Sequence, residues 1–566
     1  MIYNASNLNH YRKRCKDKMN MELEINRLDH YGVVAGVIKD LKLVEQIDNL
    51  LGIHELSEIS HGEAIAGMIL NGLGFTDRPL SLAPQFFENK PLELLFRPGV
   101  RAEHFNRFKL GRTLDMAHTH GCEALFGSLA ASVCQQEQVD CSFGCEDTTS
   151  FSMTGEYLPD QNTQAVTITN GYSKDHRPDL KQVVLEMMTS QDGGIPLLMK
   201  CWDGNSDDNS IFQHRSKKLV EAWKDMEAPR YLIMDSKGYS KKNAINLKSL
   251  NFITRIPETN KPAKTAIQNA LNQENWESWD EQRKYTCLEI EHYEIQQRWI
   301  VVFSEAAFNR SEKTVEKASI KEKTQIDKAL YHLQAERFET ETEAKSALDK
   351  LYKKWKYHQL KTVEIKEHKK YQSKGRPGKN TPFDIKYQIT FKVEKDLEQI
   401  EQIVRERACF IIGSNIPQSE LSDIEVLQAY QRQDHVEKGF GFLKSSLCFA
   451  SAFFLEKPAR IEGLIMVMTL SLLVYTTAQR RLRKALEKQD ETIPNQIKQP
   501  NKRPTMRWIF QILEGINHVV IRENQRVRVM LEGINELRRK ILALLGDSVA
   551  EIYQVVPRSQ NNCVKC

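Results

Sequence analysis

No part of this sequence has the roughly 18 uninterrupted apolar residues that a membrane-spanning helix needs. The closest run, Gly463 to Tyr475, has 13 residues and predicts a buried helix instead. The N-terminus also lacks the apolar run that is cleaved from exported proteins. We therefore expect a cytoplasmic protein that has no membrane partner.

Cysteine is present, with 11 residues, but few are spaced as metal ligands. Cys563 and Cys566 form a single CxxC pair, and Cys141 and Cys145 have no further ligands near them in the sequence. A structural zinc site normally takes four ligands, so we expect none here. Cysteines without an export signal are typical of a reducing compartment.

A strong overall charge is missing as well, since the formal net charge is only +5. The positive charge is concentrated near the C-terminus, where residues 480–540 contain 15 Lys or Arg against 7 Asp or Glu. This local excess is larger than that of the whole chain and favours a surface that faces phosphate groups. A solvated helix face explains the same excess equally well.

The 566 residues provide the mass of roughly three or four domains. Changes in periodicity divide them into zones. The zones are 1–135, helical; 136–260, short strands alternating with helices; 261–405, an insertion with a strand and a charge-rich helical stretch; 406–478, a strand followed by helices; and 479–566, basic and helical. Expected strands in the second zone are 164–169, 182–188, 195–201, 231–235 and 252–256, with a helix near 211–224.

Two acidic residues lie at the ends of predicted strands. Asp235 ends the apolar run Tyr231-Leu-Ile-Met, and Asp147 opens the β-prone run Asp147-Thr-Thr-Ser-Phe. Such acids can converge with a third acid on a pair of metal ions. Carboxylate oxygens suit Mg²⁺ or Mn²⁺, and two such ions roughly 3.5–4 Å apart can clamp the oxygens of a phosphoryl displacement.

The third acid is Glu437, in the segment Tyr430-Gln-Arg-Gln-Asp-His-Val-Glu-Lys-Gly-Phe-Gly-Phe-Leu-Lys444. Tyr430 lies seven residues before Glu437, Gln433 lies four before it, and Lys444 lies seven after it. At 3.6 residues per turn all four fall near one stripe of a single predicted helix. A carboxylate, a phenol and an ammonium on one stripe are suited to chemistry on a phosphate backbone.

With these residues the chain resembles a prokaryotic insertion-sequence transposase of the Asp-Asp-Glu (DDE) superfamily, in the branch with the Tyr-x2-Arg-x3-Glu-x6-Lys (YREK) signature. Gln433 stands at the signature's arginine position, with Arg432 beside it. Five other segments are also similar to this family: Gly74 to Phe87, Gly171 to Gln182, Gly204 to Asp207, Asp235 to Tyr239 and Phe252 to Pro257. The similarity therefore extends over most of the chain.

The resemblance implies an α/β fold, in which a ribonuclease-H-like mixed sheet with flanking helices is interrupted by the insertion. Zones 136–260 and 406–478 would form the catalytic core, and zone 1–135 a helical DNA-binding or accessory domain. Asp147, Asp235 and Glu437 would be both catalytic residues and ligands of two Mg²⁺ ions, for which Mn²⁺ could substitute. Tyr430, Arg432 and Lys444 would bind DNA near the scissile bond.

The implied reaction is hydrolysis at the transposon end, followed by attack of the freed 3′-hydroxyl on target DNA. The implied partners are double-stranded DNA, at the terminal inverted repeats and the target, and a second copy of the chain in a paired-end complex. The implied location is the cytoplasm, at the nucleoid.

The insertion contains Trp299, on the predicted strand Arg298-Trp-Ile-Val-Val-Phe303. In the resembled family an insertion at this place helps to hold the transposon end, which makes Trp299 a candidate for stacking on a displaced base. A core tryptophan on a strand is the more common alternative.

Each acid also has an ordinary interpretation, as a turn residue for Asp147, a helix cap for Asp235 and a surface glutamate for Glu437. Two other functions stay open at this point. One is a transposase-derived DNA-binding protein that has lost catalysis, which Gln433 favours. The other is a plain Mg²⁺-dependent nuclease on the same fold.

Overall fold

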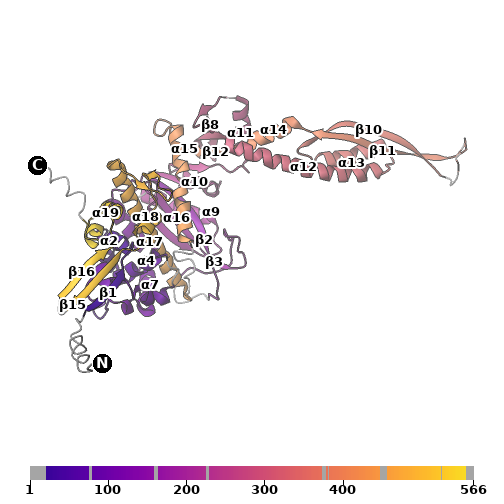
Figure 1. Cartoon of the computed structure of the whole chain (residues 1–566). Coiled ribbons are helices and arrows are strands. Elements are labelled where there is room, and N and C mark those ends of the chain that lie inside the picture. The colour runs from indigo at the N-terminus through magenta and orange to yellow at the C-terminus, as the bar shows by residue number, and fades with distance from the viewer. Residues whose placement is uncertain are drawn as a thin grey trace, which may run out of the picture. The chain divides into compact units, whose positions relative to one another are not determined.

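The computed structural model describes residues 21–75, 79–157, 164–224, 229–273, 275–372, 376, 378–379, 381–445, 455–523 and 526–555. The pair Cys563 and Cys566 lies outside these residues. The chain forms two compact units. Unit 1 consists of Met1–Phe252 and Gln428–Cys566, and unit 2 consists of Ile253–Leu427. Figure 1 labels their helices and strands.

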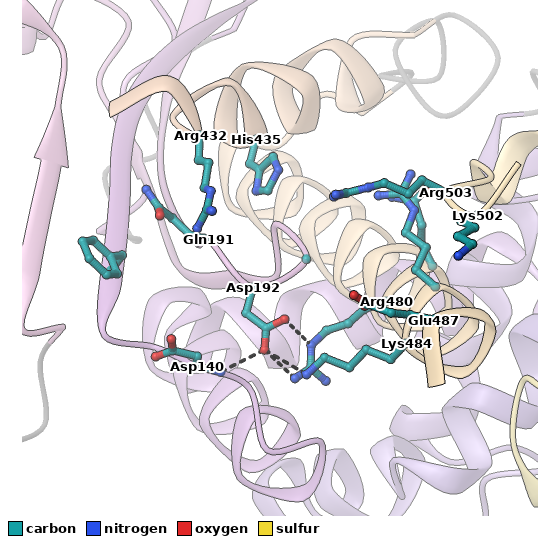
Figure 2. Close-up of a pocket in the computed structure, with 14 residues that line it drawn as sticks. Asp140, Gln191, Asp192, Arg432, His435, Arg480, Lys484, Glu487, Lys502 and Arg503 are labelled. Carbon is teal, nitrogen blue, oxygen red and sulfur yellow. Dashed lines mark hydrogen bonds and ion pairs between the residues drawn. The ribbon is translucent and has the colours of Figure 1, made fainter. Parts of the chain in front are cut away.

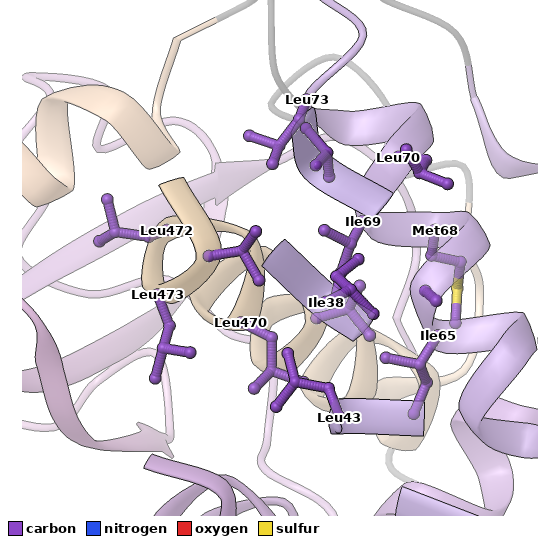
Figure 3. Close-up of a cluster of buried hydrophobic side chains, with 14 of the residues drawn as sticks. Ile38, Leu43, Ile65, Met68, Ile69, Leu70, Leu73, Leu470, Leu472 and Leu473 are labelled. Carbon is purple, nitrogen blue, oxygen red and sulfur yellow. The ribbon is translucent and has the colours of Figure 1, made fainter. Parts of the chain in front are cut away.

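The core of unit 1 is built around the long helix α17, Pro458–Lys488. It packs against α2, α4, α7 and α8, whose apolar residues recur at helical spacing. Figure 3 shows side chains of α2, α4 and α17 that meet in this core. The N-terminal helices are α2 (Tyr31–Asp40), α3 (Leu43–Leu51), α4 (His61–Gly72), α5 (Ala83–Phe87), α6 (Leu92–Leu95), α7 (Arg107–His120) and α8 (Cys122–Gln136).

In the described residues α17 is the one helix long and apolar enough to cross a membrane. However, 89% of its most apolar 18-residue window is buried inside the protein. The prediction of a buried helix at Gly463 to Tyr475 is therefore confirmed.

A three-stranded sheet joins the two ends of unit 1. Its order is β1-β15-β16, in which β1 (Met21–Arg27) pairs antiparallel with β15 (Asn517–Glu523), and β15 with β16 (Arg526–Glu532). The expected helical N-terminal region is confirmed from α2 onward, but β1 precedes it. The helical prediction is wrong for β15 and β16. The other C-terminal elements are β13 (Ile493–Pro494), β14 (Pro500–Asn501), α18 (Met506–Leu513), α19 (Glu536–Leu542) and α20 (Asp547–Ile552).

The strands that carry the predicted acids form a mixed sheet in unit 1. They are β2 (Phe143–Met153), β3 (Lys181–Ser190), β4 (Pro196–Trp202) and β5 (Tyr231–Met234), in the order β4-β3-β2-β5. β3 is antiparallel to β2 and β4, whereas β5 is parallel to β2. Helix α9 (Asp208–Lys224) precedes β5. This is the strand arrangement of a ribonuclease-H-like sheet, so the predicted fold class is confirmed. The expected strand at 164–169 is reduced to a single bridge between Thr169 and Gln182.

The segment around Glu437 forms two helices rather than one. Helix α15 (Asp423–Gln431) ends before a turn at Arg432 and Gln433, and α16 (Asp434–Leu443) begins after it. The prediction of one continuous stripe from Tyr430 to Lys444 is therefore wrong, since Tyr430 and Glu437 belong to different helices.

Unit 2 contains strands in the order β6-β12-β9-β8-β7 and a long antiparallel hairpin of β10 and β11. Helices α12 and α13 pack on β11, around a small core that includes Leu333, Ile389 and Phe391. The expected charge-rich helix is thus two helices. The elements are β6 (Phe252–Arg255), α11 (Lys261–Gln273), β7 (Glu277–Ser278), β8 (Arg283–His292), β9 (Ile295–Ser304), α12 (Glu305–Ala335), α13 (Glu341–Tyr352), β10 (His358–Tyr371), β11 (Phe383–Lys395), α14 (Leu397–Arg407) and β12 (Cys409–Ser414).

Candidate catalytic site

Asp147 and Asp235 lie side by side on the parallel strands β2 and β5. The last registered pair of these strands is Glu146 with Met234, so the next residue on each is an aspartate. Side chains at matched positions of parallel strands point to the same face of a sheet. The sequence predicted both acids at strand ends. Asp235 does directly follow β5, but Asp147 lies within β2.

Each carboxylate is held by the backbone that follows it. Asp147 Oδ1 accepts a hydrogen bond from Thr148 N (2.7 Å), and Asp235 Oδ1 accepts one from Ser236 N (2.6 Å). Burial raises the pKa of Asp147 to about 6, and the charges of Asp235 and Asp208 add to this, although Lys174 opposes them. The site therefore concentrates negative charge and lacks a full complement of cations.

A third acid at this place, Asp208, was not predicted from the sequence. It begins α9 and lines a small cavity together with Asp147 and Asp235. Thr148 Oγ1 donates a hydrogen bond to it (2.5 Å), and Lys237 Nζ lies 2.7 Å from its Oδ2. Burial alone would raise the pKa of Asp208, but the hydrogen bonds from Lys237 and Thr148 lower it. The similar segment Gly204-Asn-Ser-Asp207 ends one residue before Asp208 and is the sequence feature that could have indicated this acid.

Lys174 closes the other side of this group. Its Nζ donates to Thr148 O and Thr148 Oγ1, both at 2.6 Å, and lies 3.3 Å from Asp208 Oδ1. Lys174 thus borders the site. Two lysines and three aspartates together leave one excess negative charge at this end of the sheet.

Beneath Asp147, on the opposite face of β2, lies the buried Glu146. Burial and the neighbouring Glu186 raise its pKa well above the usual range, although Arg215 opposes this. Arg215 forms its short ion pair with Glu186, because its Nε lies 2.5 Å from Glu186 Oε1. Burial therefore favours the neutral form of Glu146 next to Asp147.

Glu437 lies on a helix that covers the same sheet face. Gly439 of α16 packs against Met187, the residue of β3 that pairs with Asp147, so α16 and the Asp147 side chain share a face. The Glu437 side chain itself is exposed and does not line the cavity of the two aspartates. Within the described ranges no three His, Cys, Asp or Glu side chains are close enough to hold a metal ion. The structure thus brings two of the three predicted acids together, and the third only to the same face.

The remaining residues of the predicted stripe lie in different surroundings. Lys444 Nζ forms an ion pair with Asp175 Oδ1 (2.7 Å) and lies 6.0 Å from the centre of the Phe151 ring on β2. Lys444 therefore lies beside β2 and pairs with the residue that follows Lys174. Gln433 is buried at the start of α16, and Arg432 is exposed and points into another cavity. Arg432 thus lies outside the cavity of the two aspartates.

Trp299 is fully buried in unit 2, with 0% of its surface exposed. Its Nε1 donates to Gln297 Oε1 (3.0 Å), so its polar atom is also satisfied within the strand. It offers no ring face to a base. The proposed stacking role does not fit this position, and the alternative of a core tryptophan does.

The donor atoms of Asp147 and Asp235 fit a hard divalent cation. Both are carboxylates at matched positions on one face of the sheet. The raised pKa of Asp147 reflects burial and nearby negative charge, which a divalent cation would offset. Glu437 lies on the helix over this face but outside the cavity of the two aspartates.

Two families match the chain. The family described as Transposase DDE domain matches residues 142–474, and a domain of unknown function (DUF4277) matches residues 23–131. No curated protein sequence matches it. A cryo-EM structure of a piggyBac transposase synaptic complex with hairpin DNA is similar over 87% of this chain and 82% of that chain, with 9% identity and a TM-score of 0.31. That score is too low to establish a shared fold, whereas the first match covers more than half of the chain and includes all three predicted acids.

Proposed function

Because the chain belongs to the Transposase DDE domain family and is a transposase, we propose that it cuts DNA at the ends of its own element and transfers the freed ends into target DNA. The reaction is cut-and-paste transposition and depends on Mg²⁺. We assign the chain to the YREK branch on the spacing of Tyr430, Glu437 and Lys444, with Gln433 as a departure from its signature.

The adjacency of Asp147 and Asp235 carries this proposal. Two acids at matched positions of parallel strands, with a glutamate-bearing helix over the same face, are what a divalent-metal phosphoryl-transfer site requires. Asp147, Asp235 and Glu437 would hold two Mg²⁺ ions, or Mn²⁺ in their place, which would activate the attacking oxygen and stabilise charge on the phosphate.

The chain's own residues then place the DNA. Lys444, which borders β2, provides a point charge for a phosphate next to the scissile bond. Tyr430 offers a phenol to the same strand. In the first step water breaks the phosphodiester and leaves a 3′-hydroxyl; in the second this hydroxyl attacks a target phosphodiester. Each step exchanges one P–O bond for another, so no covalent bond to the protein is needed.

The partners in this proposal are double-stranded DNA, at the terminal inverted repeats and the target, and a second copy of the chain that pairs the two ends. The protein would act in the cytoplasm, at the nucleoid. Neither a membrane nor a further cofactor has a role in it.

The test compares the purified protein with its Glu437→Gln variant on a DNA fragment that carries the element's own ends. Breaks are mapped to the nucleotide with and without Mg²⁺, and Glu456→Gln, which also removes an exposed carboxylate, serves as the control. We expect metal-dependent breaks at the end boundary for the wild type and the control, and none for Glu437→Gln. Specific binding without breaks by any form would refute catalysis, and breaks without preference for the ends would indicate a plain nuclease.

A further inference from the structure

A second cavity of unit 1 is lined by an excess of basic side chains (Figure 2). We call it the basic pocket. It lies between the start of β2, the turn between β3 and β4, the start of α16 and the C-terminal half of α17. The lining residues are Asp140, Phe143, Gln191, Asp192, Gly193, Arg432, His435, Gln479, Arg480, Arg483, Lys484, Glu487, Lys502 and Arg503.

Half of the basic side chains are already neutralised by acids of the protein. Arg480 Nη2 lies 2.5 Å from Asp192 Oδ2, and Lys484 Nζ lies 3.3 Å from the same oxygen. Lys502 pairs with Asp490 at 2.5 Å. These contacts fix the wall of the pocket and leave little charge for a ligand.

The other three, Arg432, Arg483 and Arg503, form no ion pair within the part of the chain that the structure describes. One donor of Arg483 is already used, because its Nε donates a hydrogen bond to Pro504 O (3.0 Å). Burial and the neighbouring charge of Arg503 lower the pKa of Arg483, so these two guanidinium groups lie close enough to repel each other. Like charges held together in this way are unfavourable unless an anion joins them.

Two further observations indicate where an anion would lie. Arg432 and Arg503 point into the pocket from opposite sides in Figure 2. His435 lines the same space and adds a polar ring to it, although its Nδ1 is buried away from the cavity. Three guanidinium groups around one cavity are the donor set of a phosphate site.

The pocket has a fixed relation to the catalytic site. Phe143, which lines the pocket, and Asp147 lie on the same strand four residues apart. A strand rises about 3.3 Å per residue, so this separation is roughly 13 Å. On a duplex whose axis runs along β2, consecutive phosphates of one strand would advance by about 3.4 Å, so roughly four nucleotides would cover the same distance.

We propose that the basic pocket binds a backbone phosphate of the DNA strand about four nucleotides from the bond that is cut. This assignment rests on the proposed function. It gives Arg432 a role at a remote phosphate rather than at the reacting one. Since Arg432 and His435 adjoin or belong to α16, a phosphate bound here would also fix the start of the helix that carries Glu437.

The test uses the full-length protein and the variants Arg432→Gln and Arg503→Gln. Arg528→Gln on β16 removes the same charge from an exposed site outside the pocket and is the matched control. Affinity for a duplex with the element's end is measured over a range of salt concentrations. We expect each pocket variant to bind about tenfold more weakly, with a salt slope reduced by about 1, while the control changes much less. Equal affinity and slope for the pocket variants and the wild type would overturn the proposal.

An ethylation-interference experiment locates the contact, because ethylation of a DNA phosphate that the protein contacts weakens binding. For the wild type, ethylation about four nucleotides from the cut should block binding, and this one position should lose its effect in Arg503→Gln. Binding is measured without cleavage, so the two proposals fail separately. If the protein never cuts but shows this interference pattern, the catalytic proposal is refuted and the phosphate-binding proposal stands. If it cuts but does not show the pattern, the phosphate-binding proposal is refuted.

Inorganic pyrophosphate distinguishes DNA from a free phosphate compound. If pyrophosphate raises the melting temperature of the DNA-free wild type but not of Arg503→Gln, while DNA binding is the same for both, the pocket serves a free ligand and the assignment to DNA is wrong. If DNA binding differs as described above, the assignment stands.

Discussion

Asp147 and Asp235 occupy the first positions beyond the last registered pair of the parallel strands β2 and β5. Their relation depends on backbone pairing and not on side-chain contacts. A substitution of either side chain should therefore alter the chemistry of the site without disturbing the sheet.

Removal of either carboxylate should abolish stabilisation by metal. For the wild type, Mg²⁺ at about 100 times its dissociation constant should add roughly 2.7 kcal/mol to the free energy of unfolding. Asp147→Asn and Asp235→Asn should lose this gain, whereas Asp179→Asn, in an exposed loop, should keep it. Thermal unfolding with Mg²⁺ and with EDTA measures the difference. An equal gain in all four proteins would mean that the metal binds elsewhere.

Gly439 should control how closely α16 approaches the sheet. A Cβ at this position would lie 3.0 Å from Met187 Cε and 3.1 Å from Leu472 Cδ2, so Gly439→Val overpacks the contact. We expect it to lower the stability by about 1–3 kcal/mol and to reduce cleavage more than DNA binding, since Glu437 moves with the helix.

The matched control is Gly441→Val on the same helix, where an added Cβ meets nothing within 4 Å. It should leave cleavage unchanged. Both rates are compared at saturating DNA. A similar loss of cleavage in both variants would show that helix propensity matters and that the approach of α16 does not.

Trp299 should contribute to stability and not to DNA binding. Because it is fully buried, Trp299→Ala should lower the free energy of unfolding by about 3–5 kcal/mol. Trp299→Leu retains much of the apolar volume and should bind DNA as the wild type does. A ring stacked on a base would contribute about 1–3 kcal/mol to binding, so a loss of that size in a folded Trp299→Leu protein would restore the stacking role.

His30 should make the stability depend on pH. It is buried, its Nε2 lies 2.9 Å from Leu73 O, and its ring stacks on Phe510 with 4.3 Å between centroids. Burial lowers its pKa to about 4, so the folded protein holds it neutral.

The unfolded chain takes up this proton near pH 6.5, and the folded protein only near pH 4. Stability is therefore fully present above pH 6.5 and decreases as the pH falls toward 4, by up to about 3 kcal/mol. The His30→Gln variant keeps a hydrogen-bond donor for Leu73 O but cannot titrate. The difference in unfolding free energy between the two proteins, measured in urea from pH 7.5 to 4.5, should narrow or reverse at low pH. A constant difference would contradict the prediction.

The strands that carry Asp147 and Asp235 could be predicted because the β-prone run after Asp147 and the apolar run before Asp235 are local features of the sequence. The break at Arg432 and Gln433 could not, because helical periodicity continues through it and the turn depends on how the two helices pack. The hairpin of β15 and β16 was missed for a similar reason. Its partner strand β1 lies about 500 residues earlier in the chain, and such pairing leaves no local pattern.

Asp208 shows another limit of sequence analysis. Nothing in its local pattern distinguishes it from the adjacent Asp207, which accepts a hydrogen bond from Ser210 N. Only the fold places Asp208 next to Thr148 and Lys237. The predicted acids were found through a family resemblance, and a resemblance finds only the residues that its motifs contain.

Unit 1 is assembled from two stretches of the chain. Asp147 and Asp235 belong to the first stretch, and Glu437 belongs to the second. On a ribosome, Asp235 emerges 202 residues before Glu437. At 5–20 residues per second this delay lasts roughly 10 to 40 s. During that time the nascent protein also lacks α17, around which the helices of unit 1 pack. A polypeptide that ends before Glu437 would therefore lack one of the three predicted acids as well as α17, so the proposed cleavage requires synthesis to continue beyond both.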